Sequence, residues 1–241
     1  MCGRFTQTRI DGHGIAQRFD VESGWESTSP EEATLGRYNV CPTEQIAIVS
    51  VKEDEERKLR SARWGLVPGW AKQLGKQREP INARSETVAE KKPFADLYKR
   101  ADRRCLVVAD GWYEWLRSEN PKQPRVPFRY TVDDGELFAF AGLFGFAKIG
   151  DEWVTSATIL TTAANEVCAP VHDRMPVVLG GIDEEAAWLA GADDPALFAP
   201  LAAARTTAKP ANPAVNRAGV EGPELIEPPP PAEPDAQQTL L

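Results

Sequence analysis

CLVVADGWYEW, residues 105–115, joins an unbroken apolar run to an acidic residue set among aromatic ones. The run Cys105–Ala109 has no polar side chain on either face, as expected for a strand that is buried on both sides. An Asp-Gly pair ends the run, and three aromatic residues then surround Glu114. We therefore predict a core strand that leads directly to a carboxylate whose pKa is raised by desolvation.

The segments on both sides of this strand also favour β-structure. Their β-branched and aromatic residues are typical of strands, and the charged or glycine-containing stretches between them are typical of turns. The Gly/Pro-punctuated stretch WGLVPGW, residues 64–70, cannot form the interior of a helix. Strands are predicted at 45–51, 59–64, 126–132, 137–143, 153–161 and 177–179, with turns at 52–57 and 133–135 and a small edge strand at Leu225-Ile226.

Helical spacing is confined to short segments between these strands. Ile15 and Phe19, four residues apart, give one segment a single apolar face. Asp183 is expected to cap the start of a later helix. Short helices are therefore predicted at 11–20, 94–101, 184–190 and 194–203, with one helical turn at 163–168.

The chain shows no internal repeat and no linker before its last residues, which favours one domain. Strands with short peripheral helices indicate an α+β fold for that domain, which we place at residues 2–226. Residues 227–241 are acidic and contain four consecutive prolines, Pro228–Pro231. This composition predicts a disordered tail.

The overall charge does not favour nucleic-acid binding. The 241 residues contain 36 acidic and 28 basic side chains, for a formal charge of -8. Five of the acidic residues and no basic ones lie in 219–241, so the rest of the chain carries only about -3. A protein of this charge is not steered to DNA by its net field, and any DNA contact must come from a local basic patch.

The four cysteines, Cys2, Cys41, Cys105 and Cys168, are spread along the chain without a CxxC pair. The sequence shows no secretory signal and no apolar run long enough to span a membrane. We therefore expect a cytoplasmic protein with reduced thiols, without a membrane segment. We also expect it to need no metal or other cofactor.

The second residue carries the chemistry of greatest interest. A small residue after the initiator methionine normally allows that methionine to be removed, which would leave Cys2 as the first residue. Its α-amine, with an ordinary pKa of about 7.7–8.0, and its thiol would then be two nucleophiles on adjacent carbons. Such an aminothiol condenses with an aldehyde to an imine and closes to a thiazolidine. Without removal of Met1 the amine does not exist.

Three further residues could assist such a condensation. Glu114 could move protons because its desolvated carboxyl group titrates closer to neutral pH. His172 titrates near neutral pH and is a second candidate acid or base. Asn82 could hydrogen-bond a sugar oxygen or orient the amine. Each of these residues also has a purely structural interpretation when it is taken alone.

Basic and aromatic residues in the same sequence blocks could hold a nucleic acid. The guanidinium groups of Arg4 and Arg84 suit bidentate phosphate binding. Trp64, Trp70 and Trp115 could stack on bases, at ~1–3 kcal/mol for each stacked base. We assign DNA binding to Arg4, Arg84, Trp70 and Trp115.

Six blocks in order give the chain a specific resemblance. They are MCGRF, RYNVCP, WGLVPGW, INARSET, DGWYEW and VHDRMPVVL, beginning at residues 1, 37, 64, 81, 110 and 171. This order resembles the SOS response-associated peptidase (SRAP) family, which senses abasic sites in single-stranded DNA. The resemblance covers the chain from Cys2 to about Ile226. Relatives often carry a further aromatic residue after the second tryptophan of WGLVPGW, where this chain has Ala71.

The resemblance implies a fold and an activity. The fold is a curved, β-barrel-like mixed core with helices around it. The activity is a DNA-protein crosslink between Cys2 and the ring-opened sugar of an abasic site in single-stranded DNA, formed by a monomer during the DNA damage response. The family is also linked to removal of its own Met1 by a cysteine-type peptidase activity, and a lyase side reaction through the imine is plausible. Catalytic roles are implied for Cys2, Asn82, Glu114 and His172, and DNA contact for Arg4 and Arg84.

Three other functions remain open at this stage. An N-terminal-nucleophile amidohydrolase or cysteine peptidase would use the same Cys2, with its α-amine as the base. A metal-binding protein could use Cys168 and His172, which lie four residues apart, although no second ligand pair is evident. A single-strand binder without chemistry would tolerate loss of the Cys2 thiol.

Overall fold

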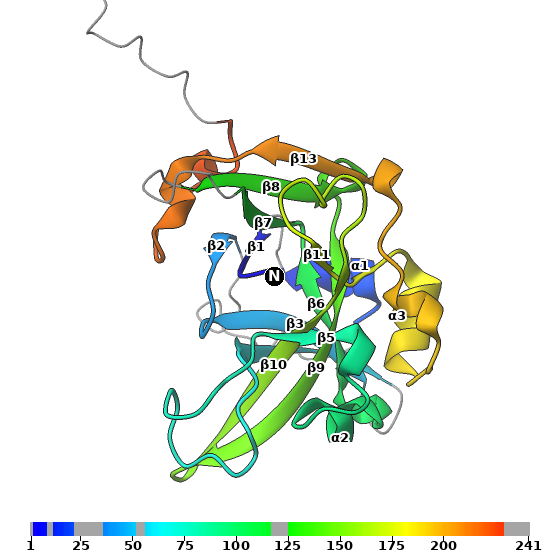
Figure 1. The fold of residues 1–241 in the computed structure, drawn as a ribbon. Helices are drawn as coiled ribbons and strands as arrows, with labels where there is room; N and C mark the ends of the chain where they lie inside the picture. The colour runs from blue at the N-terminus through cyan, green and yellow to red at the C-terminus, as the bar shows by residue number, and fades with distance from the viewer. Residues whose placement is uncertain (1, 9–11, 22–35, 52–55, 117–124, 229–241) are drawn as a thin grey trace, which may run out of the picture.

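Five strands close on themselves to form a β-barrel (Figure 1). The computed structural model describes residues 2–8, 12–21, 36–51, 56–116 and 125–228. Around the barrel the order is β10-β4-β3-β6-β9, and pairing of β9 with β10 closes the ring. Among the pairs of these five described strands, only β4–β10 is parallel. The barrel strands are β3 (Gln45–Val51), β4 (Arg57–Trp64), β6 (Arg104–Ala109), β9 (Phe138–Ile149) and β10 (Glu152–Ala163).

A second sheet of five antiparallel strands, in the order β13-β8-β7-β1-β2, packs against the barrel. Side chains of both sheets meet in one buried cluster, which includes Phe5, Trp64 and Phe140. The first and last strands of the chain thus belong to the same sheet. Its strands are β1 (Arg4–Gln7), β2 (Arg37–Val40), β7 (Gly111–Leu116), β8 (Val126–Val132) and β13 (Thr206–Pro210).

The chain passes from the barrel to the second sheet through Asp110, which lies between β6 and β7. Its buried carboxylate accepts hydrogen bonds from the hydroxyl groups of Thr6 and Thr8, which fixes β1 beside this junction. A Cβ atom on Gly111 would lie 2.9 Å from Thr6 Oγ1 and from the Tyr130 carbonyl oxygen. The close approach of three strands therefore requires glycine at this position.

The remaining elements flank the barrel. Strands β5 and β11 pair with β10, and β12 pairs with β9. The three α-helices of the described residues pack on the barrel face that does not meet the second sheet. There Phe19, Tyr98 and Trp188 join barrel side chains in another buried cluster. These elements are β5 (Asn82–Arg84), β11 (Arg174–Pro176), β12 (Val178–Leu179), α1 (Gly12–Phe19), α2 (Phe94–Tyr98) and α3 (Ile182–Leu189).

The expected α+β fold, a curved and barrel-like mixed core with peripheral helices, is confirmed. Three local expectations are wrong. The segment 194–203, predicted as a helix, forms a 3-10 turn at Pro195–Phe198, and the next 3-10 turn begins only at Ala203. Asp183 lies within α3, and the residue before that helix is Gly181. Leu225 ends a short 3-10 turn that begins at Pro223, so the residues at 225–226 do not add an edge strand.

The domain limits of 2–226 and the disordered tail stay predictions, and residues 229–241 lie outside the described part of the chain. The predicted turn at 52–57 also falls largely on residues that the structure does not describe. Among the described helices, none has the length and apolar character that crossing a membrane requires.

Candidate functional site

Asn82 reaches across from β5 to Cys2, which lies two residues before β1. Its Nδ2 donates a hydrogen bond of 2.7 Å to the carbonyl oxygen of Cys2, although the two residues are 80 positions apart. Parallel pairing with Ile159 of β10 holds the backbone of Asn82 in place. Its Oδ1 is buried and has no hydrogen-bond partner among the described residues, so it can accept from an added donor such as an amine or a sugar hydroxyl.

Cys2 itself is fully buried in the cluster between barrel and sheet. Burial, together with the negative charge of Glu114, raises the pKa of the Cys2 thiol well above its usual range. The thiol is therefore neutral at physiological pH, and its use as a nucleophile requires a neighbouring base.

Glu114 lies on β7 and is only 5% exposed. Burial raises the pKa of its carboxyl group, while the positive charge of the chain's amino terminus opposes the rise. Its charge also contributes, after burial, to raising the pKa of the Cys168 thiol to about 12. Glu114 thus lies within electrostatic range of both Cys2 and Cys168, as the predicted proton carrier must.

His172 follows a tight turn in which its backbone N–H donates to the carbonyl oxygen of Cys168 at 3.0 Å. Its Nδ1 lies 3.0 Å from the backbone N of Arg174 and 2.9 Å from Oδ1 of Asp173. The first contact requires a lone pair on Nδ1 and the second requires a proton there. The two contacts thus correspond to different tautomers or charge states of the ring, and both hold the imidazole beside Asp173 and Arg174.

The turn that carries His172 is tied to the strand that carries Asn82. Arg174 is buried, and its guanidinium group donates to both carboxylate oxygens of Glu86, two residues beyond β5. The same guanidinium donates to the carbonyl oxygen of Thr161 on β10 at 2.6 Å. The ion pair therefore fixes the two candidate site segments relative to each other.

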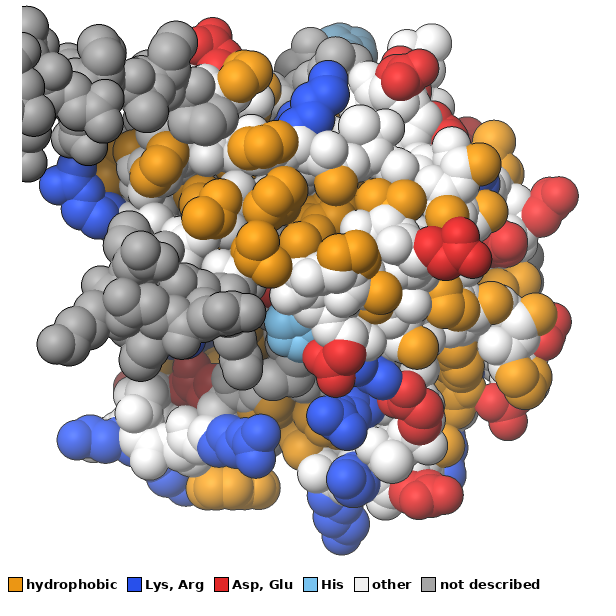
Figure 2. Space-filling view, turned by 45° about the horizontal axis from the view of Figure 1, so that its top comes forward, with side chains coloured by type: hydrophobic (Ala, Val, Ile, Leu, Met, Phe, Trp, Pro, Cys, Tyr) orange, Lys and Arg blue, Asp and Glu red, His pale blue; other side chains and the backbone are white. Residues whose placement is uncertain are grey.

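An open groove reaches the site from the surface. It has a volume of about 630 Å³, and its lining includes Trp70, Asn82, Arg84 and Lys91. Trp70 is 72% exposed, which is unusual for so large an apolar side chain. In Figure 2, lysine and arginine side chains gather with hydrophobic ones along the lower part of the molecule. Since Asn82 both lines the groove and bonds Cys2, the groove ends one hydrogen bond from Cys2.

Arg4 and Trp115, the other two predicted DNA contacts, lie on a different face. Side chains alternate along β7, and Tyr113 packs in a buried cluster with Trp115, away from the cluster that holds Cys2. The Arg4 guanidinium lies 5.9 Å from the Trp115 ring and donates to Asn39 Oδ1 at 2.7 Å. The structure thus brings Trp70 and Arg84 to the groove and places Arg4 and Trp115 together on the outer side of the second sheet.

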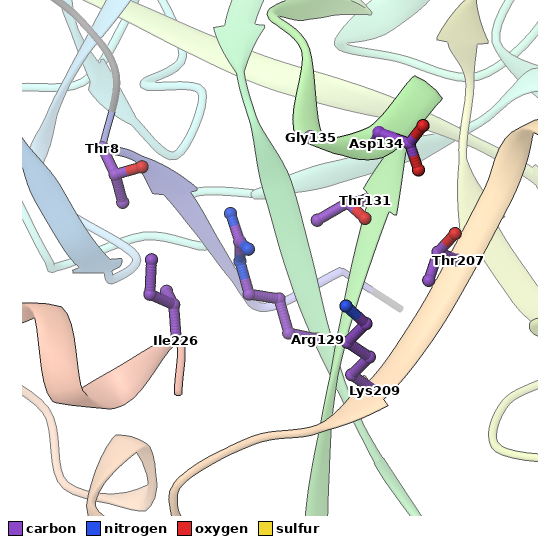
Figure 3. A pocket seen from close by; sticks show the side chains of 8 residues that line it. All are labelled: Thr8, Arg129, Thr131, Asp134, Gly135, Thr207, Lys209 and Ile226. Atoms are coloured by element: carbon purple, nitrogen blue, oxygen red, sulfur yellow. The ribbon is translucent and has the colours of Figure 1, made fainter. Parts of the chain in front are cut away.

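A smaller hollow lies on this second sheet (Figure 3). Its lining includes Arg129, Lys209 and Thr207, and its volume is about 190 Å³. Arg129 pairs with Tyr113 across the sheet, so its side chain and that of Glu114 point to opposite faces. This hollow is therefore not part of the site around Cys2.

Glu86 and Arg174 are the site residues that sequence reasoning missed. Both stand in the blocks that carry Asn82 and His172, and their opposite charges were the available signal. Cys168 and His172 are joined through their backbones, and no group of three or more potential metal ligands occurs among the described residues.

Comparison with known proteins gives a consistent result. The family model described as SOS response associated peptidase (SRAP) matches residues 1–218. The abasic site processing protein YoqW of Bacillus subtilis is 35% identical over 240 residues, covering 94% of this chain and 99% of that protein. The abasic site processing protein YedK of Escherichia coli is 36% identical over 183 residues, covering 74% and 75% of the two chains.

Solved structures show the same fold. A crystal structure of a protein from Bacteroides thetaiotaomicron matches with a TM-score of 0.77 and covers 95% of this chain and 99% of that one. Its sequence identity is 19%, so this likeness concerns the fold.

Proposed function

The chain belongs to the SOS response associated peptidase family, and from this premise we propose that it binds DNA at abasic sites and links Cys2 covalently to them. The observation that carries the proposal is the position of Asn82. This residue lines the open groove and also holds the Cys2 backbone at 2.7 Å, so a sugar in the groove lies next to the nucleophile.

The first requirement is removal of Met1, which gives Cys2 a free α-amine. We propose that the protein's own cysteine-type peptidase activity removes it. The unpartnered Oδ1 of Asn82 is then available to accept a hydrogen bond from the new amine. An amine held in this way presents its lone pair in a fixed direction, which favours attack on a carbonyl carbon.

The second step joins the amine to the sugar. An abasic site in its ring-opened form carries an aldehyde, and attack by the amine gives a carbinolamine. A proton must then reach the carbinolamine oxygen so that water leaves and the imine forms. Glu114, whose pKa is raised by burial, retains a proton at higher pH than an exposed carboxyl group and is the proposed donor.

The third step closes the ring. The Cys2 thiol has a raised pKa and is neutral, so its proton must be taken as sulfur bonds to the imine carbon and the nitrogen gains a proton. Glu114, deprotonated in the previous step, and His172 are the proposed bases. The thiazolidine that results removes the aldehyde needed for strand cleavage, whereas an imine that does not close allows a slow lyase reaction.

We propose single-stranded DNA as the substrate and a monomer as the active form. The exposed Trp70 at the groove can stack on an unpaired base, and Arg84 and Lys91 can meet phosphates. The contact between Asn82 and Cys2 forms within one chain, so this part of the proposed site needs no second subunit. The cytoplasm, where thiols stay reduced, suits a protein that depends on Cys2.

A gel-shift experiment under denaturing conditions tests this function. The protein without Met1 is expected to form a heat-stable adduct with an abasic single strand, and Cys2→Ala to form none while it still binds the strand. A protein that removes Met1 but forms no such adduct would instead fit the alternative of an N-terminal-nucleophile peptidase.

A further inference from the structure

A second groove lies directly beyond the one that holds Asn82. Four residues, Pro68, Trp70, Lys92 and Pro93, line both cavities and therefore form the ridge between them. The second groove has a volume of about 670 Å³, similar to the first, and does not include any of the four proposed catalytic residues. It is open to solvent along its side, since Trp70 on the ridge is 72% exposed.

The lining of this groove includes a second exposed tryptophan. Trp153 is 71% exposed and stands at the start of β10, where it pairs with Lys148 near the end of the β9–β10 hairpin. Trp70 and Trp153 are the two exposed tryptophans among the described residues. An exposed aromatic ring leaves a large apolar surface in contact with water. A nucleobase that stacks on the ring covers this surface.

Cationic groups line the same groove as the two tryptophans. Lys92, Arg100 and Arg103 line the second groove, against one acidic lining residue, Asp96. The Arg103 guanidinium lies 5.0 Å from the centre of the Phe146 ring and 3.6 Å from Oδ2 of Asp102, a loose ion pair at the surface. Arg100 is exposed and pairs with Asp102 at 2.7 Å, a contact of the kind that a phosphate replaces at little cost.

We propose that this groove is a second subsite for single-stranded DNA, which holds the nucleotides on one side of the abasic site. The proposal rests on the proposed function, because it extends the same DNA track across Trp70. Two exposed aromatic rings and three cations along one groove match a strand that carries both bases and phosphates. Because the two grooves adjoin at four shared residues, one strand can pass from the first groove into the second.

Binding to shortened strands tests the subsite. Three oligonucleotides carry a central tetrahydrofuran, an abasic analogue without an aldehyde. One has long flanks on both sides, and each of the others has one flank cut to a single nucleotide. Trp153→Ala is expected to weaken binding of the long strand and of one shortened strand by between about 5-fold and about 150-fold, which is the loss of one stacked base. It should leave the other shortened strand, which cannot reach the groove, unchanged.

Matched variants show whether the loss of DNA affinity in Trp153→Ala comes from the missing aromatic ring or from any change at the surface. Ile182→Ala removes another exposed apolar side chain, 65% exposed, and is expected to change none of the three affinities. Trp153→Phe should retain most of the binding, because it keeps a ring. Arg100→Gln should lower the slope of log K against log salt by about 0.7 for the long strand, as expected for one lost phosphate contact.

The proposed subsite would be overturned if Trp153→Ala lost equal affinity for both shortened strands, or if it lost affinity for none of the three strands. Because the tetrahydrofuran strands cannot crosslink, these results do not depend on Cys2. A wild-type protein that binds all strands but never crosslinks an aldehyde-bearing one would overturn the proposed function and leave the subsite standing.

Discussion

The side-chain amide of Asn82 and the backbone carbonyl of Cys2 are joined by a 2.7 Å hydrogen bond across 80 residues of sequence. This bond connects a residue that lines an open groove to a fully buried cysteine. The groove and the proposed nucleophile therefore share one positioning side chain, that of Asn82.

Asn82→Ala should slow crosslinking by ~100-fold, since a displacement of about 1 Å at the reacting atoms costs that much. Stability should change little, because Asn82 is only partly buried and its strand is held by backbone pairing with β10. The rate of adduct formation on denaturing gels and a thermal melt check both points. Thr207→Ala, on the second sheet, serves as the control. A normal rate in Asn82→Ala would contradict the role given to this contact.

Glu114→Gln should change the pH dependence of crosslinking as well as its rate. Burial raises the pKa of Glu114, so in the wild type the protonated, donating form is present at low pH and is lost as the pH rises through that raised value. The wild-type rate of crosslinking should therefore decline at alkaline pH. If the rate depended only on the Cys2 amine, it would stay high there, because the amine is unprotonated. In the variant the rate should be lower throughout and this decline should be absent. Superimposable profiles would show that another group supplies the proton.

Glu86→Gln should act through Arg174 and not on the substrate. The hydrogen bond from Arg174 lowers the pKa of Glu86 below its ordinary value of 4.5. The pair therefore stabilises the fold above pH 4.5, and this contribution is lost as the pH falls through the lowered value. The wild type should melt at a higher temperature than the variant at pH 7, and the gap should narrow at pH 3.

The same variant should crosslink more slowly while it binds abasic single strands with unchanged affinity, because only the relative placement of Asn82 and His172 is loosened. A loss of DNA affinity equal to the loss of rate would instead make Glu86 or Arg174 part of the binding surface.

Trp70→Ala and Trp115→Ala should differ in their effects. Trp70 is 72% exposed at the groove, so its loss should weaken binding of single-stranded DNA by ~1–3 kcal/mol. Trp115 packs in the cluster of Tyr113 and donates from Nε1 to Asn216 at 2.5 Å. Its loss should lower the melting temperature and change DNA affinity less. Equal losses of affinity would mean that DNA also crosses the outer face of the second sheet.

Much of the barrel could be predicted from local sequence. The continuous apolar run at 105–109 and the β-branched run at 45–51 each form a strand, because a strand buried on both faces needs apolar side chains at successive positions. Strand β5 was missed since three residues, Asn82–Arg84, are too few to show alternation. It exists because β10 supplies its hydrogen bonds.

The limits of sequence reasoning at the site are also physical. In β7 the first four residues are all buried, so the pattern does not reveal that Glu114 faces Cys2 while Trp115 faces away. The ion pair of Glu86 with Arg174 spans 88 residues and depends on strands that meet only in the folded barrel. Composition likewise gave no sign of the basic groove, because its cations are outnumbered by acids elsewhere in the chain.

The most direct test of the central claim is the intact mass of the protein after incubation with an aldehyde-bearing abasic oligonucleotide. The account predicts a chain that lacks Met1 and carries the oligonucleotide, at the sum of the two masses less one water, and no such species for Cys2→Ala. An adduct on a chain that retains Met1, or a chain without Met1 that binds the strand yet gains no mass, would contradict it.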